Sequence, residues 1–220
     1  MLQELEFQVL EVYQELDVAV AAFAGHTGLA CPQGCGHCCS SENVEATVLE
    51  CIPVAFELFR TFQAELILKR LEKNGDEKRC VLYRSDYTEV GLWGCSQYRT
   101  RTVVCRLFGF AGNRDRTGIP RLAMCRVMKE RLRPETITVA LKHDDLVMPL
   151  FSEAGLRITA LHPGLGTLRM PVNTALREAL QKVGMILDLA APDRVVLLSD
   201  PEHPPDKPIF PLTPIKKRAA

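Results

Sequence analysis

The sequence is poor in aromatic residues and contains no long apolar run. Phenylalanine, tryptophan and tyrosine make up 6% of its 220 residues, with a single tryptophan. No apolar segment reaches the roughly 20 residues that a membrane-spanning helix needs, so we expect no membrane insertion. Residues 1–20 carry acidic side chains and lack the basic start of a secretory signal peptide. These absences together predict a cytoplasmic protein with no membrane partner.

The chain also has no net charge, because 27 basic side chains match 27 acidic ones. The charge is uneven, however: residues 1–77 carry 4 basic and 13 acidic side chains, residues 78–133 carry 13 and 4, and residues 134–220 carry 10 of each. A basic segment can bind nucleic acid, but here the few aromatic residues are not interleaved with the arginines, which argues against nucleic acid as a partner. We expect the basic segment to offset a thiolate cluster or to contact the acidic first third.

No internal repeat and no linker-rich boundary interrupts the sequence before residue 200. A chain of this length can bury a hydrophobic core without covalent cross-links, so its nine cysteines do not indicate a small disulfide-stabilised scaffold. Disulfides are rare in the cytoplasm, and cysteines there indicate metal or redox chemistry. We predict one domain over residues 1–199 and a proline-rich, basic, poorly ordered tail over residues 200–220.

Four of the cysteines fall within residues 31–39, in the pattern C-x3-C-x2-C with one more cysteine attached. They are Cys31, Cys35, Cys38 and Cys39. Three thiolates at these spacings can converge on one zinc ion or one iron–sulfur cluster. Neighbouring residues in extended backbone point to opposite sides, so Cys38 and Cys39 should not share one tetrahedral ion. Either the loop is kinked there, or the two thiols serve different metals or different corners of a cluster.

A second, widely spaced group of cysteines lies in the basic segment. It consists of Cys80, Cys95, Cys105 and Cys125. An arginine directly follows Cys105 and Cys125, and we expect these two guanidinium groups, of Arg106 and Arg126, to favour the thiolate. Cys51 lies in an apolar helical stretch and is interpreted as core packing. His37 could bind zinc, although an exposed position in the loop is the simpler interpretation.

Apolar residues recur at spacings of three and four over residues 2–24, which predicts a helix that stops at Gly25. A second helix is expected from the capping box of Thr47 and Glu50 to about Lys73. The proline at position 53 indicates a later start for this helix, near Cys51 or Ile52.

A third helix is predicted over residues 172–190, with Asn173 or Thr174 as its cap. Residues 162–166 are expected to form a loop, residues 134–160 fit either a helix or a strand, and residues 195–198 fit a short strand. The fold class is therefore mainly α, with helices around irregular cysteine-rich loops and few short strands.

The sequence resembles the CxxxCxxCC cysteine-cluster family in four features. They are the cysteine loop, Cys80, a Cys-x-x-Tyr unit at residues 95–98 and a Cys-Arg-x-Phe unit at residues 105–108. Its members are described as zinc- or iron-chelating, and it is similar to a cysteine-rich part of flagellin lysine-N-methylases. The resemblance covers roughly residues 20–127. The chain lacks the prolines that the family often has after its equivalent of Cys80 and at position 102, which affects loop stiffness and leaves the ligands in place.

The resemblance implicates seven cysteines in a metal site. They are Cys31, Cys35, Cys38, Cys39, Cys80, Cys95 and Cys105. We add Cys125 as a further candidate ligand.

Three functions compete. The first is a metal-binding protein that holds an iron–sulfur cluster or zinc, with a redox role and an unidentified protein or redox partner. Iron–sulfur is favoured because adjacent thiols suit a multi-iron centre better than one tetrahedral ion. The second is an enzyme that is methylase-like or uses S-adenosylmethionine, although the strands expected of such a barrel are few and no Gly-rich cofactor loop is visible. The third is a zinc-stabilised interaction module.

Overall fold

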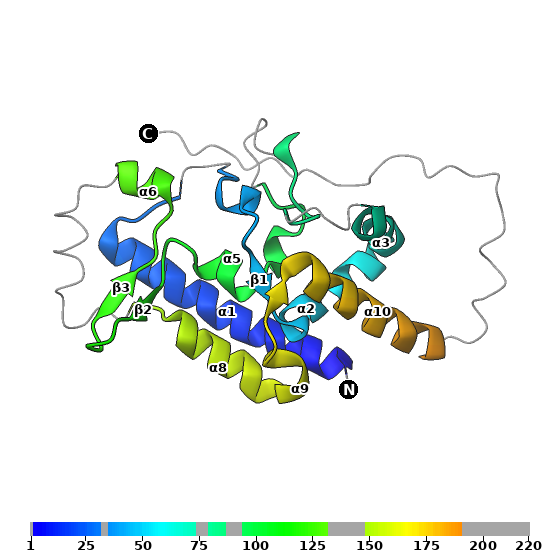
Figure 1. The fold of residues 1–220 in the computed structure, drawn as a ribbon. Helices are drawn as coiled ribbons and strands as arrows, with labels where there is room; N and C mark the ends of the chain where they lie inside the picture. The colour runs from blue at the N-terminus through cyan, green and yellow to red at the C-terminus, as the bar shows by residue number, and fades with distance from the viewer. Residues whose placement is uncertain (1, 32–34, 74–78, 87–93, 132–147, 191–220) are drawn as a thin grey trace, which may run out of the picture.

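The computed structural model describes residues 2–31, 35–73, 79–86, 94–131 and 148–190. Its principal helices are α1 (Leu2–Thr27), α2 (Val48–Arg60), α3 (Ala64–Lys73), α5 (Val103–Leu107), α6 (Arg126–Arg131), α8 (Phe151–Leu161), α9 (Pro163–Gly166) and α10 (Val172–Ala190). Two 3-10 turns, η1 (Cys38–Ser40) and η2 (Tyr98–Thr100), interrupt the cysteine-bearing segments. The prediction of a mainly helical fold is confirmed (Figure 1).

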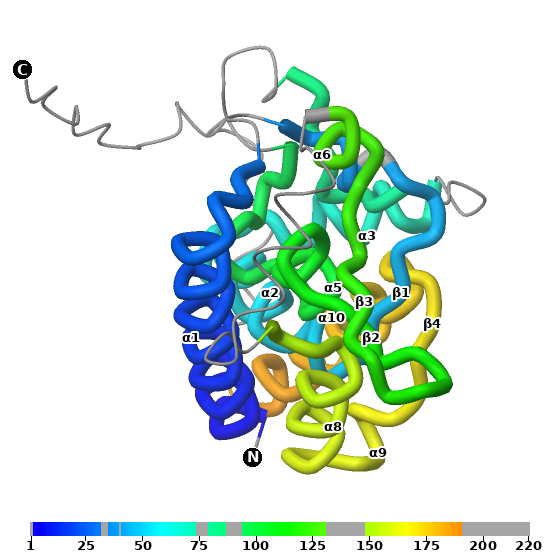
Figure 2. The backbone as a smooth tube through the Cα atoms, turned by 90° about the vertical axis from the view of Figure 1, so that its left-hand side faces the viewer, coloured from blue at the N-terminus to red at the C-terminus, as the bar shows by residue number. Residues whose placement is uncertain are grey.

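The strands are short and form two antiparallel pairs. They are β1 (Glu45–Ala46), β2 (Gly112–Arg114), β3 (Pro120–Leu122) and β4 (Met170–Pro171), with β1 against β4 and β2 against β3. The first pair joins the segment that follows the cysteine loop to the start of α10. In two perpendicular views, η1 lies at the end of the molecule opposite α8 and α9, whereas α5, which carries Cys105, lies nearer the middle and contacts α8 (Figure 1, Figure 2).

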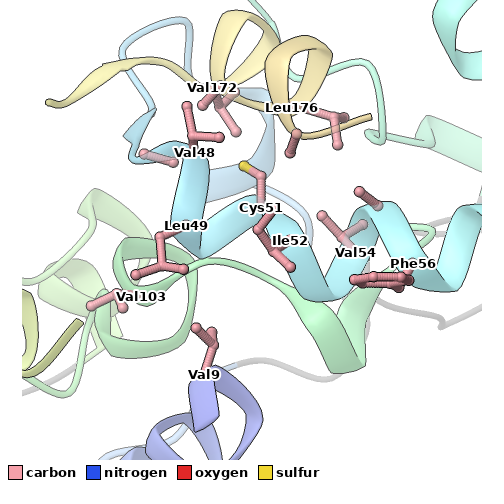
Figure 3. Close-up of a cluster of buried hydrophobic side chains, with 14 of the residues drawn as sticks. Val9, Val48, Leu49, Cys51, Ile52, Val54, Phe56, Val103, Val172 and Leu176 are labelled. Carbon is pink, nitrogen blue, oxygen red and sulfur yellow. The ribbon is translucent and has the colours of Figure 1, made fainter. Parts of the chain in front are cut away.

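Helix α2 is the centre of the core. All of its residues from Val48 to Phe56 are buried, together with Leu58. A helix that is buried on every side needs neighbours around it, and α10, α1 and α9 supply most of them. Figure 3 shows Cys51 among these side chains, with Leu176 of α10 nearby. Cys51 is 1% exposed, so its interpretation as core packing agrees with the structure.

The capping box at the start of α2 forms as predicted. The Glu50 backbone N–H donates to Thr47 Oγ1 at 3.2 Å, and the Thr47 N–H donates to Glu50 Oε1 at 3.1 Å. The expected later start of the helix is wrong, because Pro53 lies inside it. The capping box and the burial of α2 offset the one hydrogen bond that a proline removes.

The single helix predicted to reach Lys73 is divided into α2 and α3. Phe62 has a φ of 57°, a left-handed conformation that ends α2, and its side chain is 87% exposed. At the break, the Gln63 N–H donates to the Leu58 carbonyl at 2.8 Å. This backbone turn has no proline or glycine to mark it in the sequence.

Two further boundaries differ from the predictions. Helix α1 continues past Gly25 to Thr27 and is followed by Gly28, whose φ of 65° suits a residue without a Cβ. Residues 163–166 form the short helix α9 where a loop was expected, because His162 Nδ1 accepts the Leu165 N–H at 3.2 Å.

Among the described residues, no helix combines the length and hydropathy required to cross a membrane. The possible strand at residues 195–198 and the predicted tail at residues 200–220 lie outside the described residues, as do residues 134–147. The division into one domain and a tail remains a prediction.

The buried carboxylate of Glu50 joins α2 to α5. Its Oε2 accepts the Val103 N–H at 2.9 Å, in addition to the bond from Thr47 to Oε1, and the side chain is 1% exposed. Helix α5 carries Cys105, so this carboxylate fixes a cysteine-bearing helix to the core.

We expect Glu50→Ala to lower the free energy of unfolding by about 3 kcal/mol, because two buried N–H groups lose their acceptor. The control is Glu57→Ala in the same helix, which removes a half-exposed ion pair with Arg60 and should cost less than about 1 kcal/mol. Chemical denaturation of the two variants measures the difference. Equal losses would show that Glu50 is not a structural link.

Candidate metal centre

Seven cysteines line one cavity of about 290 Å³. They are Cys31, Cys35, Cys38, Cys39, Cys80, Cys95 and Cys105. The remaining lining residues are mostly apolar or aromatic, and they include Tyr83, Tyr98, Phe108 and Phe110. The cavity therefore brings together thiols from the loop at residues 31–39 and from three later segments of the chain.

The first group reaches the cavity through a turn of 3-10 helix. The Cys39 N–H donates to the Gly36 carbonyl at 3.0 Å, and Cys38 and Cys39 open η1. Their Sγ atoms lie 4.0 Å apart, so the kinked form of the loop is the one observed. This distance is close to the edge of a tetrahedron of thiolates around zinc, about 3.8 Å for a Zn–S bond of about 2.3 Å. Of the alternatives that the sequence left open, the kinked loop is therefore the one that the structure has.

The second group is held by short backbone interactions. Tyr83 and Cys95 form an isolated antiparallel bridge, and the Ser96 N–H donates to the Leu82 carbonyl at 2.9 Å. This bridge places the segment of Cys80 beside that of Cys95. Cys105 comes from α5, where the Thr102 hydroxyl donates to its sulfur at 3.5 Å.

Burial and mutual repulsion keep most of these thiols protonated when no cation is bound. Burial, with charge from neighbouring thiols, raises the pKa of Cys31 and Cys80 to about 12 and that of Cys105 to about 11. Cys38 is the exception. A hydrogen bond from Cys39 lowers its pKa to about 7, and the charge of Arg101 contributes in the same direction. The same hydrogen bond raises the pKa of the Cys39 donor.

Arg101 is the cavity-lining arginine whose charge acts on the thiols. Its guanidinium lies 4.0 Å from the Tyr98 ring centroid and donates to the Cys105 carbonyl at 3.3 Å. Its charge helps to lower the pKa of Cys38 and opposes part of the rise in pKa that burial causes at Cys95. Sequence reasoning missed this residue because it considered arginines directly adjacent to a cysteine. The relevant signal was the spacing of four residues between Arg101 and Cys105.

The two arginines that sequence adjacency selected have other roles. Arg106 lines the cavity, but its guanidinium stacks 4.1 Å from the Tyr13 ring centroid and pairs with Asp17 of α1. Arg126 is exposed and pairs with Glu130 at 3.0 Å. The ion pairs of Asp17 with Arg101 and Arg106 confirm a contact between the basic segment and the acidic first third.

The other candidates lie outside the cavity lining. Cys125 packs against a second hydrophobic cluster and accepts the Met128 N–H at 3.4 Å, although its charge still raises the pKa of Cys31. His37 is exposed, as the simpler interpretation expected.

Within the part of the chain that the structure describes, no three cysteine, histidine, aspartate or glutamate side chains stand at metal-coordinating geometry. The donor chemistry nevertheless fits a soft metal, since thiolates are the ligands that zinc and iron–sulfur clusters take. The assignment of individual cysteines as ligands remains a prediction.

Residues 30–126 match the model of the CxxCxxCC family, described as "Putative zinc- or iron-chelating domain". The matched segment contains the cysteine loop and extends past Cys125. A search of curated proteins and a search of solved structures gave no match. The resemblance seen in the sequence is thus confirmed at the level of the family.

We expect Cys51→Ala to leave the metal content unchanged and to lower the free energy of unfolding by about 1 kcal/mol or somewhat more, as for a small truncation in a core. Cys80→Ser is the matched comparison, and it should lose metal. Metal analysis and chemical denaturation of both variants provide the test. Loss of metal from Cys51→Ala would make this cysteine a ligand.

In the metal-free chain, Cys38 should be the most reactive cavity thiol at neutral pH. Because its pKa is about 7, its alkylation rate should rise with pH and level off above about pH 8 as thiolate formation completes. Cys105, with a pKa of about 11, should react more slowly and continue to accelerate. Mass spectrometry after iodoacetamide treatment measures both rates. Equal rates for the two thiols near neutral pH would contradict the expectation.

Proposed function

We propose that this chain, whose residues 30–126 match the CxxCxxCC family model, binds metal through cysteine thiolates and holds an iron–sulfur cluster in preference to zinc. The observation that carries the proposal is the single cavity lined by seven cysteines.

The number of thiols favours a centre with several metal atoms. A structural zinc ion takes four ligands, and seven thiols on one cavity exceed that number. A [2Fe–2S] or [4Fe–4S] cluster is also held by four cysteines, so seven thiols supply enough ligands for one cluster and leave three for a further metal atom. Such a cluster, when bound, would supply one-electron redox chemistry, and a protein redox partner would follow from it.

The chain's own residues prepare the cavity for a negatively charged centre. Arg101 places a positive charge beside Cys38 and Cys95, which offsets part of the repulsion among thiolates. Phe108 and Phe110 form part of the wall and limit access of water. Charge, polarity and exposure around a cluster are the properties through which a protein sets its reduction potential.

Zinc is the second candidate, and one observation favours it. The 4.0 Å between Cys38 Sγ and Cys39 Sγ matches the ligand spacing of one tetrahedral ion. The domain would then be a zinc-stabilised interaction module. The enzymatic alternative has less support, because the strands among the described residues are two or three residues long and do not form the repeating barrel that it needs.

The test is anaerobic purification of the full chain, followed by an absorption spectrum and metal analysis. We expect a brown protein with broad absorbance near about 400 nm that contains iron and acid-labile sulfide. Cys35→Ser should lose most of the iron, whereas Cys51→Ala should retain it. A colourless protein with stoichiometric zinc would replace iron–sulfur with zinc, and a protein that takes up neither metal would refute the proposal.

Hydrogen exchange on the wild type and on Cys35→Ser would show whether the metal supports the fold. Binding free energy that exists only in the folded state adds to stability, so protection should fall in residues 35–44 and 94–125 of the variant. Helix α10 should keep its protection longer, because it packs on α2. Uniform protection in both proteins would make the metal an addition to a finished fold.

A further inference from the structure

The junction of β4 and α10 contacts both groups of cysteine-bearing segments, although it lies well beyond the matched segment of residues 30–126. On one side, β4 pairs with β1, and the Val172 N–H donates to the Val44 carbonyl at 2.9 Å. Val44 lines the cysteine cavity and follows the first cysteine loop. The first turn of α10 is thus attached to the chain that leaves Cys38 and Cys39.

On the other side, Asn173 binds the backbone on both flanks of Cys80. Its Oδ1 accepts the Val81 N–H at 2.9 Å, and its Nδ2 donates to the Arg79 carbonyl at 2.8 Å. The two bonds use the donor and the acceptor of one amide, so they fix the orientation of the amide as well as the position of the peptide. Cys80 lies between the two bonded residues.

These contacts have a consequence for the spacing of the thiols. Val172 and Asn173 are adjacent in the chain. Val172 is hydrogen-bonded to the segment that follows the first cysteine group, and Asn173 is hydrogen-bonded to the segment of Cys80. Their short connection sets the distance between the two segments across the cavity. The sequence pattern predicted Asn173 as a helix cap, but its side chain is committed to these bonds with residues 79 and 81.

We propose that Asn173 is a positioning residue that holds Cys80 at the thiol cavity, so that the metal-holding unit includes the first turn of α10. The effect on metal retention rests on the proposed function, whereas the effect on the position of the thiol does not.

The experiment compares the full-length wild type with Asn173→Ala and with Arg177→Ala as a matched control. Arg177 lies one turn along the same helix and also donates a side-chain hydrogen bond to backbone, to the Leu71 carbonyl of α3 at 3.2 Å. It contacts α3, which carries no cysteine. The control variant therefore shows the effect of losing a hydrogen bond between α10 and the rest of the fold at a place away from the cavity.

The first readout is the alkylation rate of Cys80 in the metal-free chains, measured with iodoacetamide and mass spectrometry. We expect Asn173→Ala to react about tenfold faster than the wild type, because the loss of two hydrogen bonds releases residues 79–81. Arg177→Ala should react at the wild-type rate. Equal rates in all three chains, or equal acceleration in both variants, would overturn the proposal.

The second readout is the rate at which a chelator removes metal from the reconstituted chains, followed through the absorption spectrum of the centre. Asn173→Ala should release metal about tenfold faster, the typical loss when a group that orients a ligand is removed. If Asn173→Ala does not fold, Asn173→Asp takes its place in both readouts, because aspartate keeps the acceptor for the Val81 N–H and loses the donor to the Arg79 carbonyl. Wild-type rates in Asn173→Asp would contradict the proposal. A wild type that takes up no metal would refute the proposed function, while the alkylation rates would still decide the role of Asn173.

Discussion

Repulsion between thiolates is the constraint on which the rest of this structure depends. Several sulfur atoms from distant parts of the sequence face one largely apolar cavity, where each negative charge makes the next more costly. Burial first, and then the charge of neighbouring thiols, raises the pKa of Cys31, Cys80 and Cys105 and keeps these thiols protonated when no cation is bound. A bound metal removes the repulsion by replacing protons with positive charge. The protein therefore has to hold the thiols together by other interactions, and it does so from its helices.

Three polar links connect the helical core to the cysteine-bearing segments. Glu50 of α2 accepts the first N–H of α5, the helix of Cys105. Arg106 of the same short helix pairs with Asp17 of α1. Asn173 of α10 bonds to both flanks of Cys80. The links involve charged groups or two hydrogen bonds at a time, which are stronger and more directional than apolar contacts. A segment with little regular structure can thus hold a defined position.

The sequence predicted what depends on local pattern and missed what depends on tertiary contact. Helix α10 and the capping box of α2 follow from periodicity and from residue types at fixed spacing, and so their positions agree with the structure. The break at Phe62 did not follow, because the left-handed turn there uses a residue that rarely adopts it. The gathering of cysteines could be expected from a resemblance to a family, and positive charge beside them from the basic segment, but the arginine that supplies this charge could not. Arg106 is adjacent to Cys105 in sequence, yet neighbouring residues on a helix face different directions, and Arg106 turns to Asp17 while Arg101 reaches the thiols.

The arrangement also separates two sources of stability. Helices α1, α2 and α10 share one hydrophobic core, whose buried side chains extend from Leu2 to Val183 and do not depend on a metal. The cysteine-bearing segments between them add some side chains to this core, such as Leu82, Val103 and Leu107, and are also fixed by the polar links and by short backbone bridges. A core of this kind can remain folded while the metal is gained or lost, so the thiols stay close enough to bind it again. This favours a metal that stabilises the cysteine-bearing segments on an already folded core over one whose binding creates the whole fold, and it explains why the links reach the site from helices on both sides of the core.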